Sequence, residues 1–288
     1  MISLPKILIL AIIQGACELL PVSSSAHVIF AEKLMGLDPT SPSMTLLLIM
    51  LHTGTMFAVI VFFWKSWREN FFKSSQVFIE SFKLLLIATI ATGVIGIFLK
   101  VIIEKIILKG VPNPEIELLF GNLYLISASL AGVGALILWA GYEESRPSKG
   151  KSVLGIKSAV LIGMVQGLCL PFRGLSRSGA TISTGLILGV EKKLLEDFSF
   201  ALAVILTPIF ILMEARRFLK AQHLINHHAT GMLGLFLPSM IGMLLSFGAG
   251  LLALKWLSRW LEAGRWYIFG YYCLFAAGVI FLLHCQGL

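Results

Sequence analysis

The sequence predicts an all-α polytopic membrane protein, built as an inverted repeat of two halves. Its 288 residues are 57% hydrophobic and only 13% charged, a composition that excludes an ordinary soluble globule. Several apolar runs are long enough to cross a hydrocarbon core of about 30 Å. A Gln-Gly-x-Cys motif at 14–17 recurs at 166–169, which indicates a duplication. We expect one membrane domain over 1–288, with a first repeat over 1–145 and an inverted second repeat over 151–288.

The first element is a helix broken at Pro21. An apolar helix is predicted from about Ile7 to Leu20, because proline cannot continue a helix and disfavours helical backbone in the residue before it. Three serines follow, and serine is a good N-cap for a second helix, predicted from about Ser25 to Met35. Each helix is too short to cross a bilayer. We therefore expect a re-entrant pair whose break is buried in protein or lines a wet cavity.

Three longer apolar runs follow the broken pair in each half, and each is long enough to span a membrane. Because three is an odd number, the second half enters the bilayer from the opposite face, which gives the inversion. A run at 71–82 carries Glu80 and is flanked by Lys83, so we expect it to form a separate interfacial helix. The predicted spans cover about 43–64, 84–103, 118–139, 198–219, 232–254 and 266–283.

Positive charge predicts which loops share a face of the membrane. The net charge of +8 is spread over short loops, without the dense Lys and Arg block typical of nucleic-acid binding, so we expect no nucleic-acid partner. Lys and Arg are most frequent near 65–83, 146–157 and 255–265, and these loops fall on one face, which we interpret as cytoplasmic. Two arginines and a lysine at 216–220 then lie on the other face, which is an exception to the preference of Lys and Arg for cytoplasmic loops.

Polar residues gather at the first break. Gln14 and Glu18 lie four residues apart, so both side chains leave the same face of the first helix. A carboxylate and an amide offer oxygen ligands that suit Mg²⁺, which takes few protein ligands; Ca²⁺ is an alternative. Ser24 and His27 lie three apart at the start of the second helix, where an imidazole can activate a hydroxyl. We expect Glu18 to be removable without unfolding, as a membrane carboxylate with no structural partner.

The second break is rich in residue types that bind phosphate. Arg177 lies between Ser176 and Ser178, at the predicted start of a helix that runs to Leu188. Backbone N–H groups at a helix N-terminus, a guanidinium group and hydroxyls together form a cradle for phosphate. An arginine at membrane depth can instead serve a structural ion pair, with Glu18 as its partner, and this alternative is open.

Two motifs, one at each break, carry a resemblance to a known family. They are Gln14-x-x-x-Glu18 with Pro21-Val22-Ser23-Ser24-Ser25-x-His27, and Gly174-x-Ser176-Arg177-Ser178-Gly179-Ala180-Thr181. Together they resemble the undecaprenyl pyrophosphate phosphatase (bacitracin-resistance) family of bacterial inner-membrane enzymes, and the similarity covers essentially the whole chain. The resemblance implies an integral membrane phosphatase that hydrolyses undecaprenyl (C55 polyprenyl) pyrophosphate to the monophosphate and inorganic phosphate. That reaction recycles the lipid carrier for cell-wall synthesis and depends on a divalent cation.

The resemblance also implies roles for individual residues. Ser24 is the candidate nucleophile or phosphate ligand, His27 the base, and Glu18 and Gln14 the residues at the cation. Attack by His27 or by a metal-bound water stays open. Arg177 would stabilise the charge on the transferred phosphoryl group. The remaining residues predicted to bind the substrate phosphates are Ser23, Ser25, Gly174, Ser176, Ser178, Gly179 and Thr181.

Three residues depart from the family pattern. Gln14 stands where a carboxylate is common, Ala26 replaces the usual Gly before His27, and Arg173 stands where a Pro precedes Gly174. The first departure removes a charge from the expected cation site, and the third adds a cation beside the phosphate cradle. His52, in a Thr-Gly-Thr setting, is expected to pack or to support the site from a distance.

The implied partners are a polyprenyl pyrophosphate lipid and membrane lipid, and a homodimer is left open. The implied location is the bacterial cytoplasmic (inner) membrane, crossed several times, with the active site opening to the extracytoplasmic side. A transporter or translocase of polyprenyl phosphate is the alternative function, because transporters also use inverted repeats with helices broken at the midplane. The combination of Glu18, Ser24, His27 and Arg177 favours the enzyme.

Overall fold

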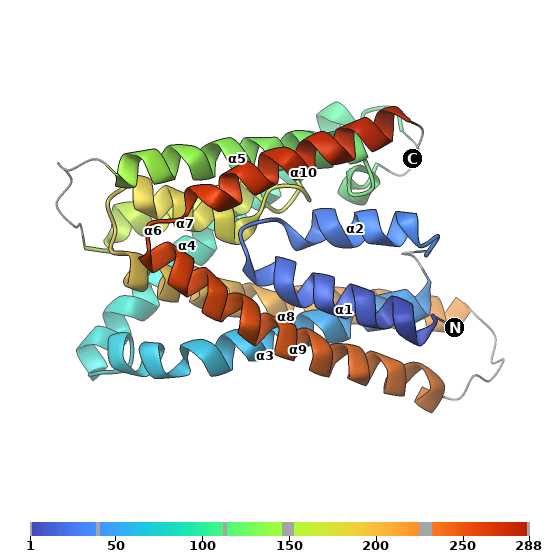
Figure 1. Ribbon diagram of the computed structural model, residues 1–288, viewed down its shortest axis with the longest axis horizontal. Helices are drawn as coiled ribbons and strands as arrows, with labels where there is room; N and C mark the ends of the chain where they lie inside the picture. Colours follow the sequence, from blue (N-terminus) through green and yellow to red (C-terminus); the bar gives the residue numbers. More distant parts are fainter. Residues whose placement is uncertain (1, 39–40, 112–113, 146–152, 225–231, 287–288) are drawn as a thin grey trace.

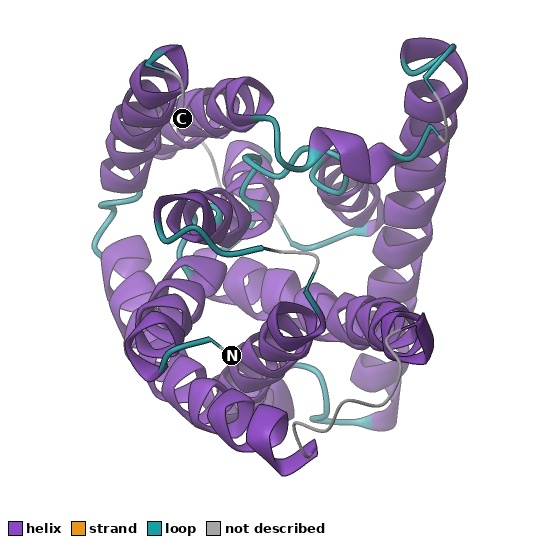
Figure 2. Ribbon diagram, turned by 90° about the vertical axis from the view of Figure 1, so that its right-hand side faces the viewer, coloured by secondary structure: helices purple, strands orange, loops and turns teal. Residues whose placement is uncertain are grey.

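The computed structural model is helical along most of the part of the chain that it describes, namely residues 2–38, 41–111, 114–145, 153–224 and 232–286 (Figures 1 and 2). Within those residues, six helices are long and apolar enough to cross a membrane, which confirms the predicted fold class. The helices are α1 (Leu4–Leu19), α2 (Ser24–Leu34), α3 (Pro42–Asn70), α4 (Ser75–Ile102), α5 (Leu123–Glu144), α6 (Ile156–Leu168), α7 (Arg177–Ile187), α8 (Lys192–Leu224), α9 (Met232–Glu262) and α10 (Tyr267–Cys285), with short helical turns at Ile103–Ile107 and Ile116–Leu119.

Both halves have the predicted order of a short helix pair followed by three long helices. In Figure 1 the pair α1 and α2 lies toward the side that carries both chain termini, whereas α6 and α7 lie toward the opposite side. The halves are interleaved, because α1 packs on α9 of the second half while α6 packs on α4 of the first, and α5 packs along α10. The inverted relation between the halves stays a prediction.

The repeated Gln-Gly motif serves this interleaving. A Cβ at Gly15 would lie 2.6 Å from the carbonyl oxygen of Ser246 in α9, so only glycine allows α1 to approach so closely. Its counterpart Gly167 lets α6 press on α4, where a Cβ would lie 2.8 Å from the carbonyl oxygen of Thr92. Gln166 is fully buried beside it and donates to Thr92 Oγ1 at 3.1 Å. Small residues at helix crossings are typical of membrane bundles.

One predicted element is wrong: the run at 71–82 is not a separate interfacial helix but begins with a turn and then joins α4. Ser74 caps α4 by accepting a hydrogen bond from Val77 N at 3.3 Å, and no proline or glycine interrupts the helix before the apolar run. The 28 residues of α4 extend for about 42 Å at 1.5 Å per residue, which exceeds a hydrocarbon core of about 30 Å. Its polar first turns can therefore project beyond the core without a break.

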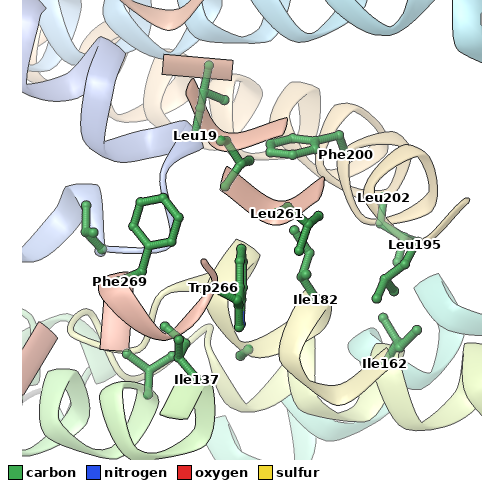
Figure 3. Packing of buried hydrophobic residues seen from close by; sticks show 14 of the residues in the cluster. Leu19, Ile137, Ile162, Ile182, Leu195, Phe200, Leu202, Leu261, Trp266 and Phe269 are labelled. Atoms are coloured by element: carbon green, nitrogen blue, oxygen red, sulfur yellow. The ribbon is translucent and has the colours of Figure 1, made fainter. Parts of the chain in front are cut away.

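The core lies around Trp266, which is fully buried at the start of α10 (Figure 3). Its indole Nε1 donates to Ser183 Oγ of α7 at 3.0 Å, which satisfies a polar group that would be costly to bury alone. Leu19, the last residue of α1, is 1% exposed and belongs to the same cluster. The end of α1 and the helix α7 are thus held by one apolar core, which fixes the two breaks relative to each other.

Candidate active site

The first helix break forms where the sequence predicts it. α1 ends at Leu19, and Leu20 is extended at φ −73° and ψ 151°, as expected of a residue before proline. Ser23 caps α2 and is the only described residue other than glycine with a positive φ, 66°. Such backbone is strained for serine and persists only where surrounding contacts enforce it. Here Ser23 Oγ donates to the carbonyl oxygen of Arg173 at 2.6 Å.

The two breaks meet directly, although about 150 residues separate them in the chain. Besides the contact between Ser23 and Arg173, Ser178 Oγ donates to the carbonyl oxygen of Leu20 at 3.3 Å. Ser178 belongs to the first turn of α7, which begins at Arg177, as predicted. One group of polar residues therefore draws on both halves of the protein.

The carboxylate of Glu18 is the centre of this group. Its Oε1 lies 2.9 Å from Arg177 Nη2, and its Oε2 accepts hydrogen bonds from Ser24 Oγ and, at 3.2 Å, from Gln14 Nε2. His52 Nε2 lies 3.9 Å from the same Oε2. The expectation that Glu18 has no structural partner is therefore wrong, and the ion pair with Arg177, left open from the sequence, is formed. Charge-assisted contacts of this kind are the stronger class of hydrogen bonds.

His27 faces away from Ser24. Its Nδ1 lies 2.8 Å from the carbonyl oxygen of Ser23, and its Nε2 lies 2.7 Å from the hydroxyl of Tyr272 in α10, with the two rings stacked at 5.7 Å between centroids. Among the described residues, no hydrogen bond joins His27 to Ser24, whose hydroxyl donates to Glu18 instead. The expected pairing of Ser24 with His27 is thus replaced by a pairing with the carboxylate, because both ring nitrogens are already engaged.

The predicted phosphate-binding residues of the second break make structural contacts, and their binding of phosphate stays a prediction. Ser176 caps α7 and accepts from Gly179 N at 3.2 Å. Thr181 is fully buried, and its hydroxyl bonds the carbonyl oxygen of Arg177 at 2.8 Å and Ser199 Oγ at 2.6 Å, which ties α7 to α8. Gly174 packs flush on α5, where a Cβ would lie 2.0 Å from the carbonyl oxygen of Ile126. In the first break, Ser25 is half-buried in the first turn of α2.

Two residues of this region were not predicted to take part, and a third was given only a supporting role. Tyr272 reaches His27 from a helix at the far end of the chain, and His52 lies beside Glu18 while its Nδ1 is held by the carbonyl oxygen of Leu48 at 2.8 Å. Glu32 of α2 is 3% exposed, and Oε1 has no hydrogen-bond partner within the described chain. A carboxylate inside the apolar run of α2 was the one signal in the sequence that could have drawn attention to Glu32.

Arg173, which departs from the family pattern, lies beside the group rather than in it. Its guanidinium carbon lies 4.0 Å from the centroid of the Phe120 ring, a cation–π contact, and its carbonyl oxygen accepts from Ser23. In the part of the chain that the structure describes, no three His, Cys, Asp or Glu side chains are grouped as a metal site. The predicted cation ligands Gln14 and Glu18 remain adjacent on α1, and their role stays a prediction.

Comparison with known proteins agrees with the two motifs. The family model described as "Bacitracin resistance protein BacA" matches residues 7–280. The chain is 56% identical over 281 residues to Undecaprenyl-diphosphatase 2 of Acinetobacter baylyi, with 96% of each chain covered. It is 31% identical over 286 residues to Undecaprenyl-diphosphatase of Bacteroides fragilis, with 97% of each covered, and 30% identical over 284 residues to Undecaprenyl-diphosphatase of Korarchaeum cryptofilum, with 93% and 94% covered. The chain therefore belongs to the bacitracin resistance protein BacA family, as its two motifs indicate.

Proposed function

We propose that this protein hydrolyses undecaprenyl diphosphate to the monophosphate and inorganic phosphate. The observation that carries the proposal is the hydrogen bond from Ser24 Oγ to the Glu18 carboxylate, with Arg177 on the other oxygen of that carboxylate. A hydroxyl with a proton acceptor and a neighbouring guanidinium group is suited to phosphoryl transfer. Relatives that cover nearly the whole chain carry the name undecaprenyl-diphosphatase.

The first step is attack by Ser24 on the terminal phosphorus. The Ser24 proton passes to Glu18 Oε2, its present hydrogen-bond acceptor, as the new P–O bond forms. The anhydride P–O bond breaks, and its electron pair leaves with the lipid monophosphate. In the second step, water attacks the phosphoserine, Ser24 Oγ leaves and recovers its proton from Glu18, and inorganic phosphate is released. Glu18 is thus the base of the first step and the acid of the second.

Arg177 has a different partner before and during the reaction. At rest its Nη2 lies 2.9 Å from Glu18 Oε1, so the half-buried carboxylate is neutralised. The substrate brings several negative oxygens, which compete with Glu18 for the planar guanidinium fork. Transfer of Arg177 to the phosphates leaves the carboxylate free to accept the Ser24 proton. The ion pair is thus compatible with both structural and catalytic roles.

We propose Mg²⁺ as the divalent cation, with Ca²⁺ as an alternative. The donor types fit: Glu18 offers a carboxylate oxygen, and Gln14 would offer its amide oxygen once the amide, whose Nε2 now donates to Glu18 Oε2, has turned. Mg²⁺ takes few protein ligands when phosphates and water complete its shell. Because Arg177 already neutralises Glu18, we expect the cation to bind together with the pyrophosphate rather than to the free protein. When bound, it would neutralise charge on the phosphates.

We further propose that the chain lies in the bacterial inner membrane, with its site opening to the extracytoplasmic side. The Lys and Arg excess near 65–83 and 255–265 supports this orientation. The turn between α3 and α4 and the turn between α9 and α10 share one side of the molecule in Figure 1, and the termini lie on the other. Residues 146–152 of the third basic loop lie outside the described residues.

Phosphate release by purified protein in detergent tests the proposal, because no membrane is present to be crossed. We expect one phosphate released per undecaprenyl diphosphate, and at least about a hundredfold less with Ser24→Ala. Ser75→Ala, an exposed serine at the start of α4, is the matched control and should retain activity. A wild-type protein that releases no phosphate contradicts the function. Activity that persists in saturating chelator contradicts the requirement for a divalent cation but not the phosphatase function.

A further inference from the structure

The ring of His27 is held at both nitrogens. The carbonyl oxygen of Ser23, 2.8 Å from Nδ1, can only accept a hydrogen bond, so Nδ1 carries a proton. In the neutral imidazole, Nε2 is then an acceptor, and the Tyr272 hydroxyl at 2.7 Å is its donor. The ring stacking between the two residues fixes the plane of the imidazole as well. His27 thus has one tautomer and one orientation, and Tyr272 supplies half of the constraint.

Tyr272 is itself held in place by its neighbours in α10. Cys273 is fully buried and its Sγ donates to the carbonyl oxygen of Pro21, at 3.3 Å, so α10 is attached to the first break. Gly270 lets α10 press on α5, since a Cβ there would lie 2.7 Å from Leu138 Cγ and 3.0 Å from the carbonyl oxygen of Gly134. The contacts of Cys273 and Gly270 therefore fix α10 on either side of Tyr272, and they place the Tyr272 hydroxyl beside His27.

We propose that Tyr272 positions His27 beside the break: its hydroxyl occupies the one lone pair of Nε2, so that a proton reaches this nitrogen through Tyr272. The role of Tyr272 in turnover rests on the proposed phosphatase function, whereas its contact with His27 does not. Glu18 already takes the Ser24 proton, which leaves His27 for the second step. There the attacking water gives a proton to the Tyr272 oxygen as Tyr272 passes its own hydroxyl proton to Nε2, the water oxygen bonds to phosphorus, and Ser24 Oγ leaves with the electron pair and regains its proton from Glu18.

The adjacent Tyr271 provides a matched control. It follows the same helix, is 63% exposed, and packs edge-on against Tyr267 rather than against the break. Tyr271→Phe and Tyr272→Phe remove the same atom from neighbouring positions. A general loosening of α10 would affect both variants, whereas loss of the His27 contact affects only the second.

The first test is ¹⁵N NMR of histidine-labelled protein in detergent, with His27→Gln to assign the signals. We expect wild-type His27 to show a protonated Nδ1 and an unprotonated Nε2. In Tyr272→Phe the Nε2 signal should shift, because this nitrogen loses its hydrogen-bond donor, while Tyr271→Phe should match wild type. A proton on Nε2 in the wild type, or an unchanged spectrum in Tyr272→Phe, overturns the proposal. This readout needs no turnover, so it stands apart from a failure of the proposed function.

The second test is the kinetics of phosphate release. Tyr272→Phe should lower kcat about tenfold, the size of one net hydrogen bond, with little change in KM. In a His27→Gln background the same change should have no further effect, because the residue it positions is gone. Equal losses with and without His27, or an equal loss in Tyr271→Phe, would show that Tyr272 only packs and would overturn the positioning role.

Discussion

Replacement of Arg177 by lysine is expected to lower kcat about a hundredfold, by analogy with removal of one donor to a transition-state oxyanion, which costs about 3 kcal/mol. Lysine keeps the charge and can still pair with Glu18, whose Oε1 lies 2.9 Å from the present guanidinium, so the variant should fold. It lacks the planar fork that makes two parallel bonds to phosphate. The loss should therefore appear in kcat more than in KM, as measured by steady-state phosphate release.

Arg173 is the matched control for this prediction. It lies four residues earlier, and its guanidinium group stacks on Phe120 rather than pairing with Glu18. Arg173→Ala should therefore raise KM more than it lowers kcat. Wild-type kinetics in Arg177→Lys, combined with an inactive Arg173→Ala, would show that the wrong arginine has been assigned to the transferred phosphate.

Replacement of Glu18 by glutamine is expected to lower turnover by at least about a hundredfold, as for loss of a general base, while changing the shape of the side chain very little. The amide cannot take the Ser24 proton, which Glu18 Oε2 is placed to accept. The change also leaves Arg177 without its partner. Breaking a fully buried ion pair in this way costs about 3 kcal/mol, and this pair is half-buried, so we expect a smaller loss that still lowers the thermal denaturation midpoint in detergent.

A double variant separates the two effects. Arg177→Met in the Glu18→Gln background removes the unpaired charge, so it should recover most of the lost thermal stability without recovering any activity. If Glu18→Gln alone turns over at the wild-type rate, Glu18 is not the proton acceptor, whatever its effect on stability.

Local chemistry made the helix breaks predictable. Pro21 ends α1 because of its fixed ring, and Ser176 caps α7 as its residue type favours. Thr181 could have been interpreted better, since a threonine inside a helix often bonds the carbonyl four residues back, as Thr181 does to Arg177. Its predicted contact with phosphate stays a prediction. Short-range rules therefore account for most of the backbone at the site.

The pairing of side chains within the site was not predictable in this way. The spacing of Ser24 and His27 favours a contact between them, but their partners are set by Glu18 and by Tyr272, which is 245 residues from His27. Likewise, the positive φ of Ser23 follows from a contact with a loop of the other half, at Arg173. These hydrogen-bond partners depend on how α10 and the second break pack against the first break. No local pattern in the sequence contains that information.

The most direct test of the account is to look for phosphate on Ser24. Protein carrying His27→Gln, in which the second step should be slow, would be mixed with undecaprenyl diphosphate, quenched with acid within the first turnover, and digested for mass spectrometry. We predict a phosphorylated peptide in which Ser24 bears the group, and its absence in the Ser24→Ala, His27→Gln double variant. Release of phosphate by the wild-type protein with no phosphoserine at any quench time in either protein would contradict the roles assigned to Ser24 and Glu18.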